Sequence, residues 1–418
     1  MTETVTEDFP GSRGRGAEAG TGRSPYAVVS ALGFGQILAW GSSYYLLAVL
    51  APAIAADTGW SLAWVIGGLS IGLVASGLVS PRIGLAIDER GGRPVLALSS
   101  CLFAAGLAGL SLSTSLPLYV GSWLLMGLAM GAGLYDAVFS TLGRHYGGSA
   151  RRLITWLTLF GGFVGIGTLS WPITAYLDAS LGWRGACMTY ASVHLLIGLP
   201  LHLLLMPRQA APVSPEKIPS TTRAPRAPAD RVLLILLAAT VTFASAISGT
   251  ISVHLLTILP AKGLTLTAAV GFGALVGPSQ VAARIVEMAV GRRFPATITM
   301  LVSTILVALG LGAASMEQPV FAAALVLYGS GIGIMSIACG AVPLEVFGPN
   351  GYATLMGLIA LPSLLAQAAA PPLLALFMEQ RGADAGLNLI AVLALANALL
   401  CIVLARAARA KEPKLSRR

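Results

Sequence analysis

The sequence predicts an all-α membrane protein in which twelve transmembrane helices form two pseudo-symmetric six-helix bundles. Three observations support this: the composition, the length of the uncharged apolar runs, and a polar linker that divides the runs six and six. Hydrophobic residues make up 56% of the 418 residues and charged residues only 10%, against ~25% charged in an ordinary soluble domain. A soluble interior cannot cover so much apolar surface, whereas a bilayer can act as its solvent.

Long apolar runs favour helices over the alternating strands of a β-barrel, because a spanning helix needs ~20 consecutive apolar residues. The expected spans are 27–53, 62–86, 95–113, 117–143, 153–177, 184–206, 231–259, 266–290, 296–315, 319–346, 352–378 and 385–405.

The spans and the segments between them define the expected domain organisation. Residues 1–24 are polar and lack an apolar core, which indicates a disordered tail rather than a signal peptide. A segment rich in Pro, Arg, Ser and Thr at 207–230 is expected to be a flexible linker. It separates a bundle at 25–206 from a bundle at 231–406, which a basic tail at 407–418 follows.

Lys and Arg are sorted by loop, and this sorting predicts the orientation. Of the 26 basic residues, 21 fall on the side of both termini and the linker, and only Arg184, Lys262 and Arg381 fall on the other side. Because cytoplasmic loops carry the excess of Lys and Arg, both termini are expected in the cytoplasm and the protein in the cell inner membrane. The net charge of +9 therefore does not indicate a nucleic-acid partner.

The loop after the second span carries a family signature. Residues 84–93 read GLAIDERGGR, which resembles the G-x-x-x-D-[RK]-x-G-[RK]-[RK] signature of the major facilitator superfamily. Gly84, Asp88, Gly91 and Arg93 match it, while Glu89 and Gly92 depart from it. The resemblance implies transport by alternating access, with Asp88 and its basic neighbours, Arg93 among them, latching the cytoplasmic ends in the outward-facing state.

Within the superfamily the chain looks most like the monocarboxylate and oxalate/formate carriers. The Gly-Trp-Ser run at 59–61, the Gly-Trp-Arg run at 182–184 and Arg284 in the eighth span are typical of that branch. Many of its members have D-x-x-x-R in the eighth span, where this sequence has Gln280 four residues before Arg284. The resemblance implies that Arg284 binds a small organic anion.

Ionisable groups inside spans are informative because each costs ~2.5–3.5 kcal/mol to insert. We expect Arg284 to anchor the anion and Asp136 to serve in proton coupling or gating. By depth, Arg82 could pair with Asp136, and by helical spacing Arg284 could pair with Glu287. The alternative is that both arginines are snorkelling or locked in ion pairs that hold a cytoplasmic gate.

Polar rings in the first and seventh spans complete the candidate site. Tyr44, Tyr45 and His254 suit a small polar substrate, and the repeat relation would place Tyr45 opposite His254. Hydrogen-bonded packing is the competing interpretation for each of them.

Signals for enzymes and cofactors fail on inspection. Ser70 lies in a G-x-S-x-G pattern, but inside an apolar helix rather than at a strand-to-helix elbow. The chain lacks a G-K-[ST] phosphate loop and H-E-x-x-H, and its four cysteines lie in four separate apolar runs. No catalytic residue, cofactor or metal is expected.

The sequence thus predicts a monomeric secondary transporter, a symporter or antiporter, for a small organic anion. Three alternatives remain open: an efflux carrier for drugs or metalloids that uses Cys339, a transporter-like receptor that does not move its ligand, and an intramembrane serine protease that uses Ser70.

Overall fold

The structure is a computed structural model of the whole chain, and it describes residues 24–164, 170–206, 228–316 and 321–415. The expected N-terminal tail and the expected linker lie outside these ranges, except for Ser24 and residues 228–230. The described residues form helices joined by short turns and contain no strand.

Every transmembrane segment is built from one or two α-helices. The α-helices are α1 (Pro25–Gly41), α2 (Leu46–Thr58), α3 (Leu62–Arg90), α4 (Gly92–Ser111), α5 (Leu116–Gly133), α6 (Tyr135–Tyr146), α7 (Ala150–Val164), α8 (Ser170–Val193), α9 (Leu199–Leu205), α10 (Pro228–Ala261), α11 (Leu266–Gly273), α12 (Val276–Val290), α13 (Ala296–Ala314), α14 (Phe321–Phe347), α15 (Tyr352–Arg381) and α16 (Ala383–Leu415). Short 3-10 turns at Gly147–Ser149 and Gly291–Arg293 and a π-helical turn at His194–Gly198 join some of them.

Eleven helical stretches of the described residues are long and apolar enough to cross a membrane. Nine of them coincide with single expected spans. Expected spans four to six are covered by two stretches, Leu116–Leu159 and Ser170–Leu205. Helical structure continues through the turn at Gly147–Ser149 and through a kink at Gly182, so adjacent spans merge there.

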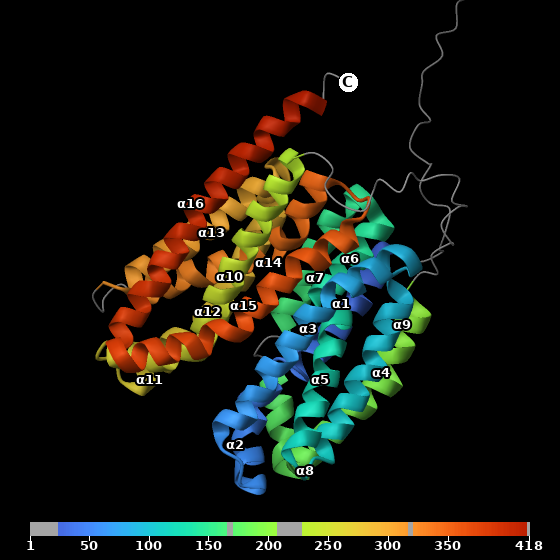
Figure 1. Cartoon of the computed structure of the whole chain (residues 1–418), viewed down its shortest axis with the longest axis vertical. Coiled ribbons are helices and arrows are strands. Elements are labelled where there is room, and N and C mark those ends of the chain that lie inside the picture. The colour runs from blue at the N-terminus through green and yellow to red at the C-terminus, as the bar shows by residue number, and fades with distance from the viewer. Residues whose placement is uncertain (1–23, 165–169, 207–227, 317–320, 416–418) are drawn as a thin grey trace, which may run out of the picture.

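The two six-helix halves lie side by side, with the N-terminal half drawn in blue to green and the C-terminal half in yellow to red (Figure 1). They approach each other at one end of the bundle and diverge toward the end where α2, α8 and α11 lie. We call the first the basic end, because Arg90, Arg93, Arg144, Arg151 and Lys411 lie there, and the second the opposite end.

The buried apolar core explains this asymmetry between the ends. At the basic end, Tyr352, Ala353 and Met356 of α15 and Leu344 of α14 belong to the same buried cluster as Phe139 and other residues of the N-terminal half. Two further clusters lie entirely within the C-terminal half. Apolar burial therefore joins the halves most extensively at the basic end.

The first transmembrane segment is interrupted in its middle, at Ser42–Tyr45 between α1 and α2. The hydroxyls of Ser42 and Ser43 donate to the carbonyls of Leu38 and Ala39, at 2.7 and 2.6 Å. Serine hydroxyls that bond to the preceding turn compete with helical hydrogen bonds and bend helices. The fourth segment is broken similarly at Leu134, and the eighth at Ala274–Leu275.

The last helix continues beyond the expected end of the C-terminal bundle. α16 stays helical through Arg406 to Leu415. Lys411 pairs with Asp230 of α10 at 2.8 Å and donates to the Val346 carbonyl at 3.1 Å. The beginning of the segment expected to be a tail is therefore packed against the C-terminal half.

Candidate functional site

Arg284 lies on α12, where it faces the N-terminal half, and only 2% of its surface is exposed. Its Nη1 donates to the Thr158 carbonyl of α7 across the boundary between the halves, at 3.3 Å. Its Nη2 donates to Gln280 Oε1 at 3.3 Å, and its Nε to the Gly333 carbonyl and the Ser336 hydroxyl at 3.3 and 3.2 Å. Gln280 and Arg284, both candidate substrate-binding residues from the sequence, are thus in contact.

All of these acceptors are neutral, and the bonds are longer than the ~2.7–2.9 Å of charge-assisted bonds. A guanidinium carries five N–H hydrogens, so at least one hydrogen on each Nη atom has no acceptor among the described residues. No carboxylate of those residues forms an ion pair with Arg284. Arg284 is therefore a buried cation, and some of its guanidinium N–H groups have no hydrogen-bond acceptor among the described residues.

The pairing of Arg284 with Glu287 expected from helical spacing is wrong. Glu287 pairs instead with Arg151 of α7, at 3.6 Å. Residues three apart on a helix share a face, but Glu287 lies a turn closer to the basic end, within reach of the arginine that enters from the N-terminal half. Helical spacing is compatible with an Arg284–Glu287 pair. The packing of the two halves places Arg151 beside Glu287 instead.

The other expected intramembrane pair, between Arg82 and Asp136, does not form either. Arg82 is exposed and forms no ion pair with any described residue. Asp136 is half-buried in the first turn of α6, where the fourth segment is interrupted. It lies near Cys339 and Tyr352 of the C-terminal half.

Aromatic rings from three helices of the N-terminal half form a continuous chain. Trp40 contacts Tyr44, Tyr45 and Tyr135, with ring centroids 5.3, 6.0 and 5.4 Å apart. Tyr45 contacts Trp171 of α8 at 6.4 Å. Tyr45 and Tyr135 also lie near Arg284.

The remaining expected ligand residues take separate positions. Tyr44 accepts a hydrogen bond from Gln367 of α15 at 3.3 Å, so it also joins the two halves. His254 donates from Nε2 to the Pro371 carbonyl within the C-terminal half, at 2.9 Å. No contact between His254 and Tyr45 is found in the described part of the chain.

Asp88, from the signature loop, joins the halves at the basic end. Its carboxylate accepts from the backbone N–H and the hydroxyl of Thr354 at 2.7 and 2.6 Å, and from the Ala353 N–H at 3.4 Å. Arg93 donates to the Leu203 carbonyl within the N-terminal half. Asp88 therefore contacts the other half directly, whereas this bond of Arg93 does not.

A second connection at the basic end was not anticipated from the sequence. Arg151 pairs with Glu287 at 3.6 Å and with Glu345 at 3.5 Å, and it donates to the carbonyls of Gly291 and Phe294 at 3.0 and 3.1 Å. All four partners belong to the C-terminal half. At the opposite end, by contrast, Arg184 pairs with Asp57 and Lys262 pairs with Asp384, each within its own half.

Comparison with known proteins identifies the family. Residues 32–298 match the Major Facilitator Superfamily. The chain belongs to the major facilitator superfamily. Members of this superfamily are transporters rather than enzymes, and this chain is a multi-pass membrane protein of that family.

Solved structures of this superfamily share the fold at low sequence identity. The crystal structure of the human organic anion transporter MFSD10 (TETRAN) is 17% identical, with a TM-score of 0.71, covering 91% of this chain and all of that one. The E. coli fucose:proton symporter FucP is 14% identical, with a TM-score of 0.68, covering 92% and 98%. The proton:xylose symporter XylE is 12% identical, with a TM-score of 0.67, covering 90% and 94%.

One curated protein is related by sequence. An uncharacterized 38 kDa protein in the 23S RNA operon of Thermoproteus tenax is 33% identical over 196 residues, which is 46% of this chain and 50% of that protein. The transporter thus spans about half the length of the curated relative it matches.

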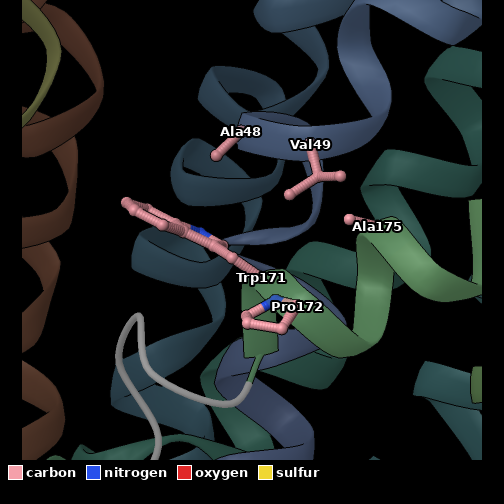
Figure 2. A pocket seen from close by; sticks show the side chains of 5 residues that line it. All are labelled: Ala48, Val49, Trp171, Pro172 and Ala175. Carbon is pink, nitrogen blue, oxygen red and sulfur yellow. The ribbon is translucent and has the colours of Figure 1, made fainter.

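An apolar pocket of about 390 Å³ opens beside the aromatic chain of this transporter. Figure 2 shows its lining, which consists of Ala48 and Val49 of α2 and Trp171, Pro172 and Ala175 of α8. The Trp171 ring points toward the side on which the ribbons of the C-terminal half lie. The pocket has no charged side chain, so it adds apolar surface to the site rather than an ion-binding group.

Proposed function

We propose that this transporter moves a small organic anion of the monocarboxylate type across the cell inner membrane by alternating access, with Arg284 as the anion anchor. The observation that carries the proposal is the environment of Arg284, a buried guanidinium with four neutral acceptors and no ion pair among the described residues. A buried charge is costly unless it is paired. A carboxylate can accept two parallel N–H bonds from the guanidinium fork and supply the missing charge.

The position of Arg284 also suits a transported anion. Its bond to the Thr158 carbonyl already crosses from the C-terminal to the N-terminal half. A carboxylate bound there contacts the Arg284 guanidinium, whose surroundings change as the two halves move relative to each other. A ligand shifts a conformational equilibrium only through different affinities for its states, and a site between the halves provides that difference.

The orientation follows from the distribution of basic residues. With the basic end in the cytoplasm, the state described here is sealed toward the cytoplasm by Asp88 and Arg151. Substrate then reaches Arg284 from the opposite end. MFSD10 is described as an organic anion transporter, which agrees with this substrate class, but the proposal rests on Arg284 itself.

Asp136 is our candidate for proton coupling. It is an intramembrane carboxylate on the N-terminal half that lies near Cys339 and Tyr352 of the C-terminal half, and no described residue donates a hydrogen bond to it. Proton relays in transporters use such groups.

The proposal is tested by flux in proteoliposomes. Purified protein is reconstituted, and uptake of a radiolabelled monocarboxylate panel is compared with uptake of the corresponding amides, which have the same shape without the charge. We expect uptake of at least one acid and of no amide. Arg284→Gln should abolish this uptake, whereas Arg293→Gln, the same change at an exposed position beyond α12, should preserve it. Equal flux through Arg284→Gln and wild type refutes the anchor.

A further inference from the structure

We infer that the substrate is an aromatic carboxylate, whose ring lies on the Trp40–Tyr45–Tyr135–Trp171 aromatic chain of the N-terminal half while its carboxylate binds Arg284 of the C-terminal half. This inference rests on the proposed function, since it specifies the anion that Arg284 binds.

The aromatic chain differs from the packed aromatic core of the same half. Tyr119 and Trp123 are 1% and 0% exposed, and they are enclosed by other residues of the buried core. Trp40, Tyr45 and Tyr135 are only half-buried, and Trp171 is 45% exposed. Rings that serve only as core packing are covered on all sides. The rings of the aromatic chain keep part of their surface exposed, although Trp40 and Tyr135 also pack against the buried core.

The rings are arranged with the geometry of aromatic recognition. Tyr45 meets Trp171 edge-on with 79° between the ring planes, and Trp40 lies tilted against Tyr135 at 46°. Offset and edge-to-face contacts at centroid distances of ~4.5–7 Å are the favourable ones. A planar ring added beside Tyr45 and Trp171 can make the same contacts, whereas a saturated ring gains only from apolar burial.

The chain is continuous with the anion anchor. Tyr45 and Tyr135 are members of the aromatic chain and also lie near Arg284. At the other end, Trp171 borders the apolar pocket formed with Ala48 and Val49 (Figure 2). From Arg284 outward, the site therefore runs from a charge, through amphipathic phenols, to an indole and apolar side chains. A carboxylate attached directly to an aromatic ring has the same order of groups.

The site is divided between the two halves, so the aromatic ring of the substrate can contact one half while its carboxylate binds the other. The anchor belongs to α12, and the aromatic residues belong to α1, α6, α8 and the α1–α2 turn. A short aliphatic acid on Arg284 engages mainly the C-terminal half. An acid with a planar ring engages both halves, so its binding favours the state in which they are close together.

Binding to the purified full-length transporter by isothermal titration tests the inference. The probes are benzoate, 1-naphthoate, cyclohexanecarboxylate and benzamide. Benzoate and cyclohexanecarboxylate are close in size and charge but differ in aromaticity. We expect benzoate and 1-naphthoate to bind at least about fivefold tighter than cyclohexanecarboxylate, because favourable ring contacts add to apolar burial. Benzamide should not bind detectably.

Variants assign the preference to the rings. Trp171→Leu should reduce the ratio of benzoate to cyclohexanecarboxylate affinity toward one, and Trp64→Leu should leave the ratio unchanged. Trp64 is the matched control because it is 59% exposed at the start of α3 and makes no ring contact with the described aromatic residues. Unfolding temperatures of both variants verify that they are folded.

The outcomes separate this inference from the proposed function. If cyclohexanecarboxylate binds as tightly as benzoate, or if Trp171→Leu keeps the preference, the aromatic inference is wrong while the anion anchor stands. If no acid binds, or benzamide binds as well as benzoate, the anchor itself is wrong and the inference is lost with it.

Discussion

The Asp88 carboxylate at the end of α3 accepts two hydrogen bonds from Thr354 in the first turn of α15, at 2.7 Å from the backbone N–H and 2.6 Å from the hydroxyl. The first N–H groups of a helix have no partner within it, and an anion there also interacts favourably with the helix dipole. Because the two residues belong to different halves, the contact exists only while the basic end is closed.

Asp88→Asn should weaken that closure. An amide presents one acceptor oxygen and no charge, so we expect a loss of about 1–2 kcal/mol in the sealed state relative to the open one. Hydrogen–deuterium exchange of residues 353–356 should become faster. Glu89→Gln changes the same charge one residue away at an exposed position and should leave exchange unchanged. Unaltered protection in Asp88→Asn would show that the contact does not stabilise closure.

Arg151 should be a stronger determinant of closure. Glu287 is only 8% exposed, so Arg151→Gln leaves a carboxylate without its cation wherever the basic end stays closed. We expect a cost of about 1–3 kcal/mol to the sealed state, seen as a longer distance between spin labels at positions 90 and 293 in a Cys101→Ser background.

Two further variants separate the cause of that effect. Adding Glu287→Gln to Arg151→Gln should restore part of the closed population, because the unpaired carboxylate is gone. Arg152→Gln, at the exposed neighbouring position, should not change the distance. If the double variant is as open as Arg151→Gln, the unpaired charge of Glu287 is not the reason for opening.

Gly84 and Gly357 set how closely α3 and α15 approach. A Cβ on Gly357 would collide with the backbone of Ser80 and Pro81, at 2.9 Å from the Pro81 Cα, and one on Gly84 would collide with the Ala353 carbonyl. Gly84→Ala and Gly357→Ala should therefore increase the spin-label distance. Gly67→Ala is the control, since its Cβ would meet nothing within 4 Å. Closed populations like wild type in both variants would contradict this packing.

The membrane-spanning segments and the family were predictable because the signals are local. Apolar length depends only on neighbouring residues, and the signature lies in the ten residues 84–93. The Gln280–Arg284 contact could also be predicted from the sequence, because residues four apart on a helix share a face.

Contacts between the halves were not predictable in this way. Arg151 and Glu287 are far apart in the sequence, and neither lies in a recognised motif. Arg151 falls between the expected spans 117–143 and 153–177, but α7 already begins at Ala150. The aromatic chain was predicted only in part. Tyr44 and Tyr45 were expected in the site, whereas Trp40, Tyr135 and Trp171 join them through the interruptions at Ser42–Tyr45 and Leu134.

Asp136 should separate proton-driven transport from exchange. If it carries the coupling proton, Asp136→Asn cannot lose that proton, so uptake driven by a pH gradient should fall to background. Exchange of labelled for unlabelled acid at equal pH needs no net proton movement and should persist. Both are measured in the same proteoliposomes. Loss of both activities with normal binding would assign Asp136 to gating, and retention of both would exclude it from coupling.

Removing the Arg184–Asp57 ion pair at the opposite end should have little effect on closure of the basic end. Arg184 and Asp57 are exposed and lie within the N-terminal half, and exposed pairs contribute little to stability. Arg184→Gln should leave the distance between labels at 90 and 293 as in wild type. A shift as large as that of Arg151→Gln would mean that the asymmetry between the two ends is not what controls the conformation.

The central claim is that the guanidinium of Arg284 is where the transported anion binds, and equilibrium binding measures this without depending on conformational rates. Benzoate or another acid transported by the wild type is titrated into wild type and Arg284→Gln, each shown to be folded by its unfolding temperature. The account predicts saturable binding to wild type and a loss of more than about tenfold in affinity for Arg284→Gln, as expected for a buried charge-assisted pair. Equal affinities for the two proteins would contradict it.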